Sequence, residues 1–505
     1  MRAGVYPSVL FVCAEIYPLA KTGGLADVCA ALPAALANEG IDVRLMLPAY
    51  PTVLAGVEAV RQVRLLSGGG RILNARMPDS GLPIYLFDQP DLFARPGGPY
   101  QDPDRRDWPD NHRRFAAFCA AAATLALDGD IDGWVPDLVH AHDWHTALIP
   151  ALFGLQTRPH PPSVLTIHNL AYQGNFPAGE AIEAGVPEAL LHTGAAEFYG
   201  QMSFLKAGIS TADRLTTVSP TYAREILAPE CGAGLDGLLR SRAKDLVGIL
   251  NGVDPEVWNP ASDIYLSHRF TTHDLTGKRA GKAALQRELG LDPDPDVPMV
   301  CFVNRLTHQK MADVMLDVLP ALAERGIQFA LHGEGDNALQ SAFTAAAGQS
   351  PNIALRVGYQ EGLAHRLTAA ADISLIPSRF EPCGLTALYA MHYGTLPVIR
   401  PVGGLADSVV DAGDATVPIL GATGFSFAEE SAEGLLAGLD RALFRFHHQD
   451  TWRRMQRTAM ERDFSWRAAA RRYLTVYGEL VPGFAASGPT ANAVLLELDG
   501  ERRIA

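Results

Sequence analysis

The feature that most constrains the fold of this chain is a repeated alternation of short apolar runs with segments of helical length. In the second half of the chain the apolar runs are Met299–Val303, Gln328–His332, Ile353–Val357, Ile373–Ile376 and Pro397–Ile399. Short runs without polar alternation are typical of strands that are buried on both faces of a parallel sheet. Strands that alternate with helices along the chain predict parallel sheets covered by helices, which is an α/β fold.

The first half of the chain repeats this pattern. Ser8–Ala14 is a predicted strand, Leu25–Asn38 a predicted helix and Asp42–Leu47 the next predicted strand. Further strands are predicted at Leu138–Ala141, Val164–Ile167 and Leu215–Val218. The alternation suffices for two domains of this class in 505 residues. We expect the joint near Asn251–Asp254, because Asn-Gly is a turn signal.

The stretch Ser378–Thr386 carries the most specific chemistry. It follows the predicted strand Ile373–Ile376, so Glu381 lies on a loop at a strand's carboxyl end, where open α/β sheets bind ligands. We expect Cys383–Thr386 to form the first turn of the next helix, whose unpaired N–H groups suit an anion. A carboxylate beside such a turn predicts a ligand that is part sugar and part phosphate. The alternative is an ordinary loop with a solvated Glu381.

Cations and glycines occupy corresponding strand ends. Arg305 and Lys310 follow the strand that ends at Val303, and together they could clamp a diphosphate. Lys21 precedes Gly23 and Gly24, where glycines would let the backbone approach a phosphate and the lysine would meet its charge. The alternative for Arg305 and Lys310 is a solvated basic loop. The KTGG stretch alone is not a Walker motif, which needs a longer loop and a lysine followed by Ser or Thr.

A repeat of five residues links the two halves. Gly23-Gly24-Leu25-Ala26-Asp27 recurs as Gly403-Gly404-Leu405-Ala406-Asp407, each time between a strand-like run and a helix-like run. We interpret the repeat as one backbone device used in each half, and only weakly as a sign of duplication.

The densest polar cluster runs from His140 to His145. His140 and His142 after a strand could be a zinc pair, as in metal-dependent hydrolases. Alternatively, Asp143 and Trp144 could hold a sugar by hydrogen bonds and ring stacking. His168-Asn169 ends another predicted strand and could face the same cleft, although a histidine satisfied by backbone groups is the ordinary alternative.

Composition narrows the partners and the compartment. The net charge of −14 argues against a nucleic acid or an anionic membrane as partner. The six cysteines are scattered without a CxxC pair, which indicates a reducing compartment. The first apolar stretch is interrupted by Glu15, so it does not resemble a signal peptide, and we expect a cytoplasmic protein.

Seven motifs occur together and in order along the chain. They are KTGGLADV at 21–28, HAHDWH at 140–145, TIHNLAYQG at 166–174, TTVSPTYAREI at 216–226, NGVD at 251–254, NRLTHQK at 304–310 and SRFEPCGLTALYAMHYGTLPVIR at 378–400. With these motifs the chain resembles the bacterial glycogen synthases, a family that includes the plant starch synthases, from about Val9 to about Leu480.

The resemblance implies the GT-B fold, with two Rossmann-like domains that face each other across a cleft. We expect a first domain over residues 1–247, a second over 248–463, a helix over 464–481 that crosses back to the first domain, and a tail over 482–505. The resemblance also implies an enzyme that transfers glucose from ADP-glucose to the non-reducing end of an α-1,4-glucan such as glycogen. It further implies retention at the anomeric carbon, with no metal or other cofactor.

The resemblance assigns roles to matching residues. The catalytic set is Glu381, Arg305, Lys310, His168 and Asp143; the substrate-binding set is Lys21, Gly23, Gly24, Asn169, Asn251, Tyr359, Cys383, Gly384, Leu385 and Thr386, to which the residues themselves add Trp144. Arg305, Lys310 and Lys21 would meet the phosphates, Glu381 the glucose, and Tyr359 the adenine.

Two departures from related patterns matter. Tyr389 stands where the wider clan of retaining GT-B enzymes has a second glutamate, as is usual in this family, so that motif offers no carboxylate pair for a double displacement. We therefore favour a front-face path in which the leaving phosphate takes the acceptor's proton. Met311 stands where the family generally has glycine, which could move Lys310.

Three alternatives remain open from the sequence. The first is a transferase of the same fold that uses UDP-glucose, because nearly every phosphate and sugar contact would be shared. The second is a zinc-dependent hydrolase built on His140 and His142. The third is a glucan-binding protein without turnover, although the complete set of Lys21, Arg305, Lys310 and Glu381 argues against it.

Overall fold

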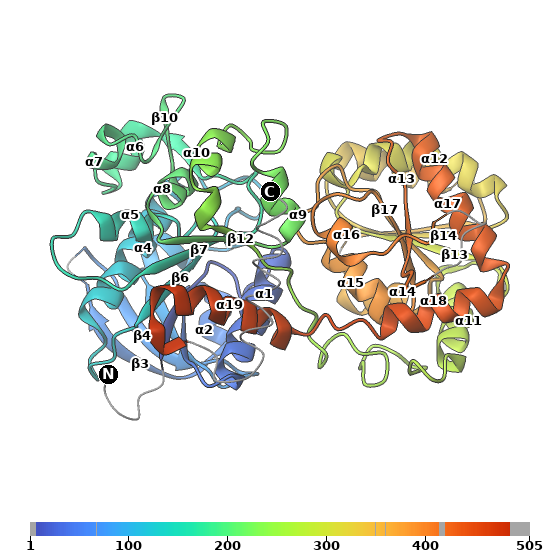
Figure 1. The fold of residues 1–505 in the computed structure, drawn as a ribbon, viewed down its shortest axis with the longest axis horizontal. Coiled ribbons are helices and arrows are strands. Elements are labelled where there is room, and N and C mark those ends of the chain that lie inside the picture. The colour runs from blue at the N-terminus through green and yellow to red at the C-terminus, as the bar shows by residue number, and fades with distance from the viewer. Residues whose placement is uncertain (1–6, 67, 349, 359, 414–419, 485–505) are drawn as a thin grey trace. The chain divides into compact units, whose positions relative to one another are not determined.

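The computed structural model describes residues 7–66, 68–348, 350–358, 360–413 and 420–484 (Figure 1). The described residues form two compact units. Unit 1 is drawn from residues 1–218, 223–252 and 466–505, and unit 2 comprises Ser219–Tyr222 and Val253–Ser465. Within these described ranges no helix is both long and apolar enough to cross a membrane.

Unit 1 is built on a nine-stranded sheet in the order β12-β11-β7-β6-β1-β2-β5-β4-β3. Its strands are β1 (Ser8–Val12), β2 (Asp42–Pro48), β3 (Glu58–Leu65), β4 (Arg71–Arg76), β5 (Pro83–Asp88), β6 (Leu138–His142), β7 (Ser163–Ile167), β11 (Arg214–Thr217) and β12 (Leu246–Gly248). Neighbours from β12 to β5 pair in parallel, whereas β3 and β4 pair antiparallel at one edge. The central strands β1, β6 and β7 are buried along their whole length, as parallel strands covered on both faces must be.

The helices of the first half of the chain are joined by one helix from near the end of the chain. They are α1 (Gly24–Asn38), α2 (Pro51–Gly56), α3 (Pro90–Phe93), α4 (Asn111–Asp128), α5 (Leu148–Gly154), α6 (Ala178–Glu183), α7 (Ala189–His192), α8 (Phe204–Thr211), α9 (Pro220–Glu225), α10 (Asp236–Ser241) and α19 (Trp466–Leu480). The strands β8 (Asn175–Pro177), β9 (Glu197–Phe198) and β10 (Gln201–Ser203) form a small separate sheet. Helix α19 lies beside α1, where Arg467 and Arg471 both donate to Glu39 (Figure 1).

Unit 2 is built on a six-stranded parallel sheet in the order β15-β14-β13-β16-β17-β18. Its strands are β13 (Met299–Val303), β14 (Gln328–Gly333), β15 (Ile353–Val357), β16 (Ile373–Ile376), β17 (Leu396–Ile399) and β18 (Phe425–Ser426). Its helices are α11 (Thr276–Leu289), α12 (Ala312–Glu324), α13 (Asn337–Ala347), α14 (Glu361–Ala370), α15 (Leu385–His392), α16 (Gly403–Ser408), α17 (Ala432–Phe446) and α18 (Gln449–Met460).

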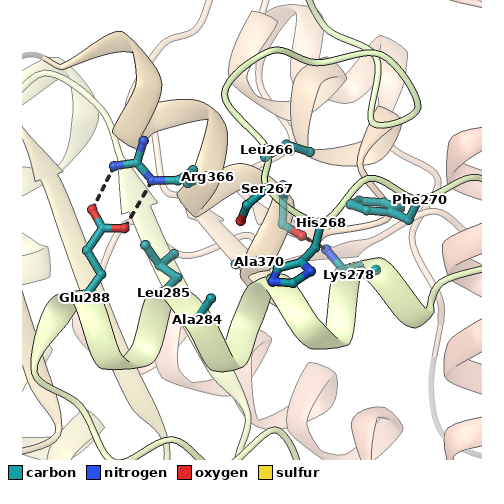
Figure 2. A pocket seen from close by; sticks show the side chains of 13 residues that line it. Leu266, Ser267, His268, Phe270, Lys278, Ala284, Leu285, Glu288, Arg366 and Ala370 are labelled. Carbon is teal, nitrogen blue, oxygen red and sulfur yellow. Dashed lines mark hydrogen bonds and ion pairs between the residues drawn. The ribbon is translucent and has the colours of Figure 1, made fainter.

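A buried lysine ties α11 to the rest of unit 2. The Lys278 ammonium donates to the carbonyl oxygens of Ala369 and Tyr393 and to the Thr395 hydroxyl, so all three of its N–H groups are used. Burial lowers the pKa of Lys278 to about 7. Figure 2 shows a small pocket beside this lysine, with an ion pair of Arg366 and Glu288 at its other end.

The structure confirms the predicted strands of both halves, mostly to within one or two residues. It corrects two expectations. Helix α15 begins at Leu385, so Cys383 and Gly384 precede the helix instead of forming its first turn. The five-residue repeat opens α1 and α16, yet Gly23 has an extended φ of −155° and Gly403 a left-handed φ of 47°, so the two copies do not share one backbone device.

Candidate active site

Unit 1 gathers its predicted site residues at one edge of the sheet. Strands β1, β6 and β7 are neighbours and run parallel, so the loops after their carboxyl ends lie together. These loops carry Lys21, Asp143 and His168 respectively. The carboxyl edge of an open α/β sheet is where such folds bind ligands, as the sequence predicted for these residues.

Asp143 holds the backbone of the neighbouring loop. Its φ is 55°, in the left-handed region that residues other than glycine rarely adopt, and its Oδ1 accepts the backbone N–H of His168 at 2.7 Å. The carboxyl is buried, and burial raises the pKa of Asp143 to about 7 against the lowering effect of backbone hydrogen bonds from His168 and Asn169. The Asp143 carboxyl is therefore poised between its two protonation states near neutral pH.

His168 pairs with a second histidine. Its Nε2 lies 2.9 Å from Nδ1 of His142, and burial lowers the pKa of His168 to about 3. Burial also holds the pKa of His142 well below its usual range. Both rings are therefore neutral at physiological pH, and one of the two facing nitrogens must donate while the other accepts.

The glycine-rich loop is organised by a residue that sequence reasoning missed. Oε2 of the buried Glu15 accepts the backbone N–H groups of Thr22 at 2.5 Å and Gly23 at 3.1 Å, while Oε1 accepts from the Tyr100 hydroxyl at 2.6 Å. The backbone N–H of Gly23, which we expected near the phosphate, therefore binds a carboxylate of the chain itself, as does that of Thr22. Lys21 forms an ion pair with Asp27 at 2.9 Å, and Gly24 begins α1.

The remaining predicted residues of unit 1 differ in their placement. Asn169 is half-buried, and its Oδ1 accepts the N–H of Ala171. Asn251 is buried, and its Oδ1 has no hydrogen-bond partner among the described residues. A buried acceptor without a partner is uncommon in folded proteins.

Trp144 corrects a prediction. The residue is 9% exposed, its ring packs against Phe115, Phe176 and Phe204, and a Cβ on Gly174 would lie 2.4 Å from the ring. The ring is a core side chain and does not offer a face for a sugar, because aromatic residues cover it. An aromatic residue at a strand end has the same sequence signature in either role.

The histidine cluster is arranged for hydrogen bonding. His140 contacts the Tyr477 hydroxyl through Nδ1 at 2.7 Å and the Thr166 hydroxyl through Nε2 at 2.6 Å, so both of its nitrogens are used. In the part of the chain that the structure describes, no group of three or more His, Cys, Asp or Glu residues could hold a metal ion. The zinc interpretation of His140 and His142 therefore has no geometric support among these residues.

In unit 2, two predicted residues contact each other. Lys310 follows β13 and Glu381 follows the neighbouring strand β16, and the lysine ammonium donates to Glu381 Oε2 in a buried ion pair. The same oxygen accepts from the Ser378 hydroxyl at 2.8 Å. The described contacts leave Glu381 Oε1 and two of the three N–H groups of Lys310 without a protein partner.

Arg305 and Met311 complete the loop after β13. Arg305 is exposed, and its guanidinium makes no hydrogen bond or ion pair with the described residues. Met311 has a φ of 49° and a fully buried side chain at the start of α12. The methionine adopts the left-handed conformation that glycine favours, so the turn after Lys310 is retained despite the departure from the family pattern.

The start of α15 offers unpaired groups beside Glu381. Gly384 has a φ of 79° and turns the chain into the helix, and a Cβ there would lie 2.6 Å from Leu405. No side chain caps this helix end, and the buried Thr386 Oγ1 has no hydrogen-bond partner among the described residues. Such a helix end suits an anion. Cys383 is buried next to it and Leu385 opens the helix.

Two tyrosines from the sequence analysis remain, Tyr389 and Tyr359. Tyr389, where the wider clan has a second glutamate, stacks on Trp258 with ring centroids 3.8 Å apart and an interplanar angle of 3°. Its side chain therefore packs within unit 2. Tyr359, the residue predicted to lie against the adenine, is outside the described residues.

A second missed residue joins the two loops of unit 2. The Arg379 guanidinium binds both carboxylate oxygens of Asp313 at 2.7 and 2.8 Å, and it donates to Glu430 and to the His308 carbonyl oxygen. It therefore holds the loop of Lys310 against the loop of Glu381. Arg379 stands two residues before Glu381, but its partners Asp313 and Glu430 lie far away in the sequence, so no local pattern pointed to them.

Comparisons with known proteins agree with this arrangement. Residues 8–241 match the family model described as "Starch synthase catalytic domain", and residues 297–443 match "Glycosyl transferases group 1". The chain is 50% identical to a glycogen synthase of Leptothrix cholodnii over 485 residues, which cover 94% of this chain and 99% of that protein. It is also 50% identical to a glycogen synthase of Burkholderia thailandensis, with 94% of this chain and 90% of that protein covered.

Solved structures show the same fold. The catalytic domain of starch synthase IV from Arabidopsis thaliana, bound to ADP and acarbose, superposes with a TM-score of 0.85 at 33% identity, and 95% of this chain and 100% of that chain are covered. A sucrose-phosphate synthase from Thermosynechococcus elongatus has a TM-score of 0.59 at 18% identity, covers 94% of this chain and 99% of its own, and shows the fold alone. The chain therefore has the GT-B fold and belongs to the glycogen synthase family of glucosyltransferases, which share the starch synthase catalytic domain.

Proposed function

We propose that this enzyme transfers the glucosyl group of ADP-glucose to the non-reducing end of an α-1,4-glucan such as glycogen, with retention at the anomeric carbon. The glycogen synthases among its relatives and the starch synthase structure with ADP and acarbose support this assignment. A cytoplasmic location is part of the proposal and is supported by the six cysteines, none of which forms a disulfide in the described structure.

The observation that carries the proposal is the half-used ion pair of Lys310 and Glu381. The ion pair uses one N–H group of the lysine and Oε2 of the glutamate. The lysine keeps two N–H donors, and the glutamate keeps Oε1 as an acceptor. The free donors suit phosphate oxygens, and the free acceptor suits a hydroxyl group of a hexose. A nucleotide sugar has both groups side by side, so one ligand can use both faces of the pair.

The groups around this pair extend the same pattern. Arg305 is a second cation after the same strand, and a guanidinium binds phosphate bidentately. The uncapped start of α15, with the Leu385 and Thr386 amides, suits the negative charge that develops on the leaving diphosphate. We propose that Cys383 and Gly384 bind the hexose through their backbone groups.

The residues of unit 1 have proposed substrate contacts of their own. We propose that Lys21, Gly23 and Gly24 bind the nucleotide-sugar phosphates and that His168 contacts the hexose. Asp143 orients the backbone of His168, and Asn169 and Asn251 supply further polar contacts. The unpaired Asn251 Oδ1 supports a substrate contact there. Tyr359 keeps its proposed place against the adenine.

A front-face mechanism fits these residues best. A double displacement needs a nucleophilic carboxylate about 5 Å from a second one. The position where the wider clan has its second glutamate holds Tyr389, whose ring stacks on Trp258. We therefore propose that the leaving phosphate accepts the proton of the acceptor hydroxyl on the same face of the sugar.

One experiment tests the proposal directly. The protein is incubated with glycogen and either ADP-glucose or UDP-glucose, and release of the nucleoside diphosphate is followed together with incorporation of labelled glucose. We expect ADP release that depends on glycogen and matches glucose incorporation. Faster turnover with UDP-glucose would assign the other donor, and release without incorporation would indicate hydrolysis and refute the proposal.

The cations provide a second test. Arg305→Ala and Lys310→Ala should each lower kcat by about 10²-fold to 10³-fold, because each removes a donor to the developing charge of the diphosphate. Arg356→Ala is the matched control, since this arginine of the same sheet donates to backbone carbonyl oxygens and is not among the proposed ligand residues. Near-full turnover of both variants at saturating donor would contradict the assigned roles.

A further inference from the structure

The buried ring of His142 has a single hydrogen-bond partner among the described residues. The ring is fully buried, with its centroid 4.1 Å from that of Phe11 and 4.0 Å from that of His140. Its Nδ1 lies 2.9 Å from His168 Nε2, whereas its Nε2 is buried and has no hydrogen-bond partner in the described structure. The sequence suggested His142 only as half of a zinc pair, and the proposed function gives this residue no role.

These contacts distinguish the two possible tautomers of the pair. If His168 donated from Nε2, the neutral His142 would carry its own proton on Nε2, and a buried N–H group would remain without an acceptor. Orphaned buried N–H groups are rarer in proteins than unsatisfied acceptors. If His142 donates from Nδ1 instead, only a bare nitrogen lone pair is left unpaired. The second arrangement is the favoured one, and it places the proton of His168 on Nδ1.

We propose that His142 is a positioning residue that fixes the tautomer of His168. His142 Nδ1–H donates to His168 Nε2 and leaves the Nδ1–H of His168 as a hydrogen-bond donor for the substrate. His168 is half-buried, and its Nδ1 has no partner in the described part of the chain, so this donor is available. The inference rests on the proposed function for the identity of the substrate, but the tautomer itself does not depend on it.

Asp143 and His142 then divide the positioning of His168 between them. Asp143 accepts the backbone N–H of His168, and His142 donates to its ring. The backbone and the ring are thus held from two sides by consecutive residues after β6. A donor held in advance toward an oxygen of the sugar would act without reorganisation during transfer.

The tautomer can be read directly from the full-length protein. ¹⁵N-histidine labelling and NMR distinguish protonated from unprotonated ring nitrogens, and His168→Asn identifies the signals of His168 by their loss. We expect a protonated Nδ1 and an unprotonated Nε2 in the substrate-free protein. A protonated Nε2 on His168 would overturn the inference whatever the enzyme's activity is.

Two substitutions at His142 separate the hydrogen bond from packing. His142→Asn keeps an N–H donor at the δ position but loses the ring, whereas His142→Phe keeps a ring against Phe11 and His140 but loses the donor. We expect kcat/KM to fall by about 10-fold to 100-fold in the Phe variant and to be partly restored in the Asn variant. Thermal unfolding should show the reverse order, because the ring packs in the core.

The outcomes also keep the inference apart from the proposed function. Absence of transfer by the native enzyme would refute the proposed function and leave the NMR result to decide the tautomer. Transfer by the native enzyme together with an Asn variant no more active than the Phe variant would refute the positioning role. A mainly structural role would make both activity and thermal stability better in the Phe variant.

Discussion

At the scale of the residue, the buried acids of unit 1 set its response to pH. Burial raises the pKa of Asp143 to about 7 and also raises the pKa of Glu15 above its usual range. The two pKa shifts affect stability in the same direction. An acid with a raised folded-state pKa is protonated in the folded chain while it is already ionised in the unfolded chain. Such groups therefore lower stability as the pH rises through this interval.

We predict that the contribution of Asp143 to the free energy of unfolding falls between about pH 4 and pH 7. The shift of about three pH units corresponds to as much as about 4 kcal/mol. Urea unfolding of the native chain and of Asp143→Asn, measured at several pH values, gives the difference. The native chain should lose stability relative to the variant as the pH rises, and a difference independent of pH would contradict the raised pKa.

Glu15 leads to a second prediction at this scale. Its carboxylate accepts two backbone N–H groups through one oxygen, and its other oxygen accepts from the Tyr100 hydroxyl. Glu15→Gln can keep this arrangement, because its amide oxygen can accept both N–H groups and the tyrosine hydroxyl can accept from its amide N–H. Glu15→Leu leaves the Thr22 and Gly23 N–H groups without acceptors.

We therefore expect Glu15→Leu to raise the KM for ADP-glucose about 10-fold or more, whereas Glu15→Gln stays close to the native value. The reason is that only the Leu variant releases the loop that carries Lys21. Steady-state kinetics measure the KM, and hydrogen exchange at residues 21–24 reports the loop itself. Equal KM values for both variants, with unchanged exchange, would show that the loop does not depend on Glu15.

At the scale of the element, most of the architecture could be predicted from the sequence. A buried parallel strand is a local pattern, since the same few residues are apolar whatever they pack against. The strands β13, β15 and β16 were predicted to the residue for this reason. The antiparallel hairpin of β3 and β4 was not predicted, because charged and polar residues interrupt the apolar ones in both strands and leave no continuous apolar run.

Site residues could be predicted only as far as their place on strand ends. The strand ends predicted that Lys310 and Glu381 lie at one sheet edge. They did not predict that the two residues contact each other, because the contact depends on β13 and β16 being neighbours in the sheet. The contact of Glu15 with the loop seven residues later was equally invisible. Trp144 was misassigned because its burial depends on Phe176 and Phe204, which arrive from later elements.

The start of α12 gives a prediction about one element. Met311 combines a left-handed φ of 49° with a fully buried side chain. Met311→Gly and Met311→Ala both remove the side chain, which costs about 2–5 kcal/mol. Only the glycine also relieves the backbone strain of about 1–2 kcal/mol. We expect Met311→Gly to be the more stable of the two variants in urea unfolding. A more stable Met311→Ala would contradict this expectation and would show that the turn relaxes to a negative φ.

At the scale of the whole molecule, unit 1 is not continuous in sequence. The chain leaves it after Gly252 and returns at Trp466, and these two residues pack closely, since a Cβ on Gly252 would lie 2.6 Å from the Trp466 nitrogen. The returning helix α19 supplies Tyr477, whose hydroxyl bonds the buried His140 at 2.7 Å. Tyr473 and Tyr477 are themselves fully buried. The fold of unit 1 is therefore completed from the last described part of the chain.

Because of this connectivity, the two units should differ in their ability to fold as separate fragments. Unit 2 needs little beyond residues 253–465, whose sheet and core cluster are continuous in sequence, so we expect this fragment to unfold cooperatively by itself. Residues 7–252 alone lack α19, which leaves the apolar face beside α1 uncovered and His140 without its tyrosine partner. Each buried aromatic side chain of that helix contributes about 2–3 kcal/mol, which is a large share of a typical domain's stability.

We therefore predict that the fragment 7–252 does not unfold cooperatively in urea, and that fusing residues 466–484 to its end through a short glycine linker restores the transition. Circular dichroism across a urea series measures both fragments. Tyr477→Phe in the fusion is the control, and it should lower the free energy of unfolding by about 1–3 kcal/mol because a buried ring nitrogen loses its partner. If fragment 7–252 and the fusion unfolded with the same urea midpoint, the prediction would be wrong. Helix α19 would then be peripheral to unit 1, and its contacts with α1 and β6 would form only after the unit has folded.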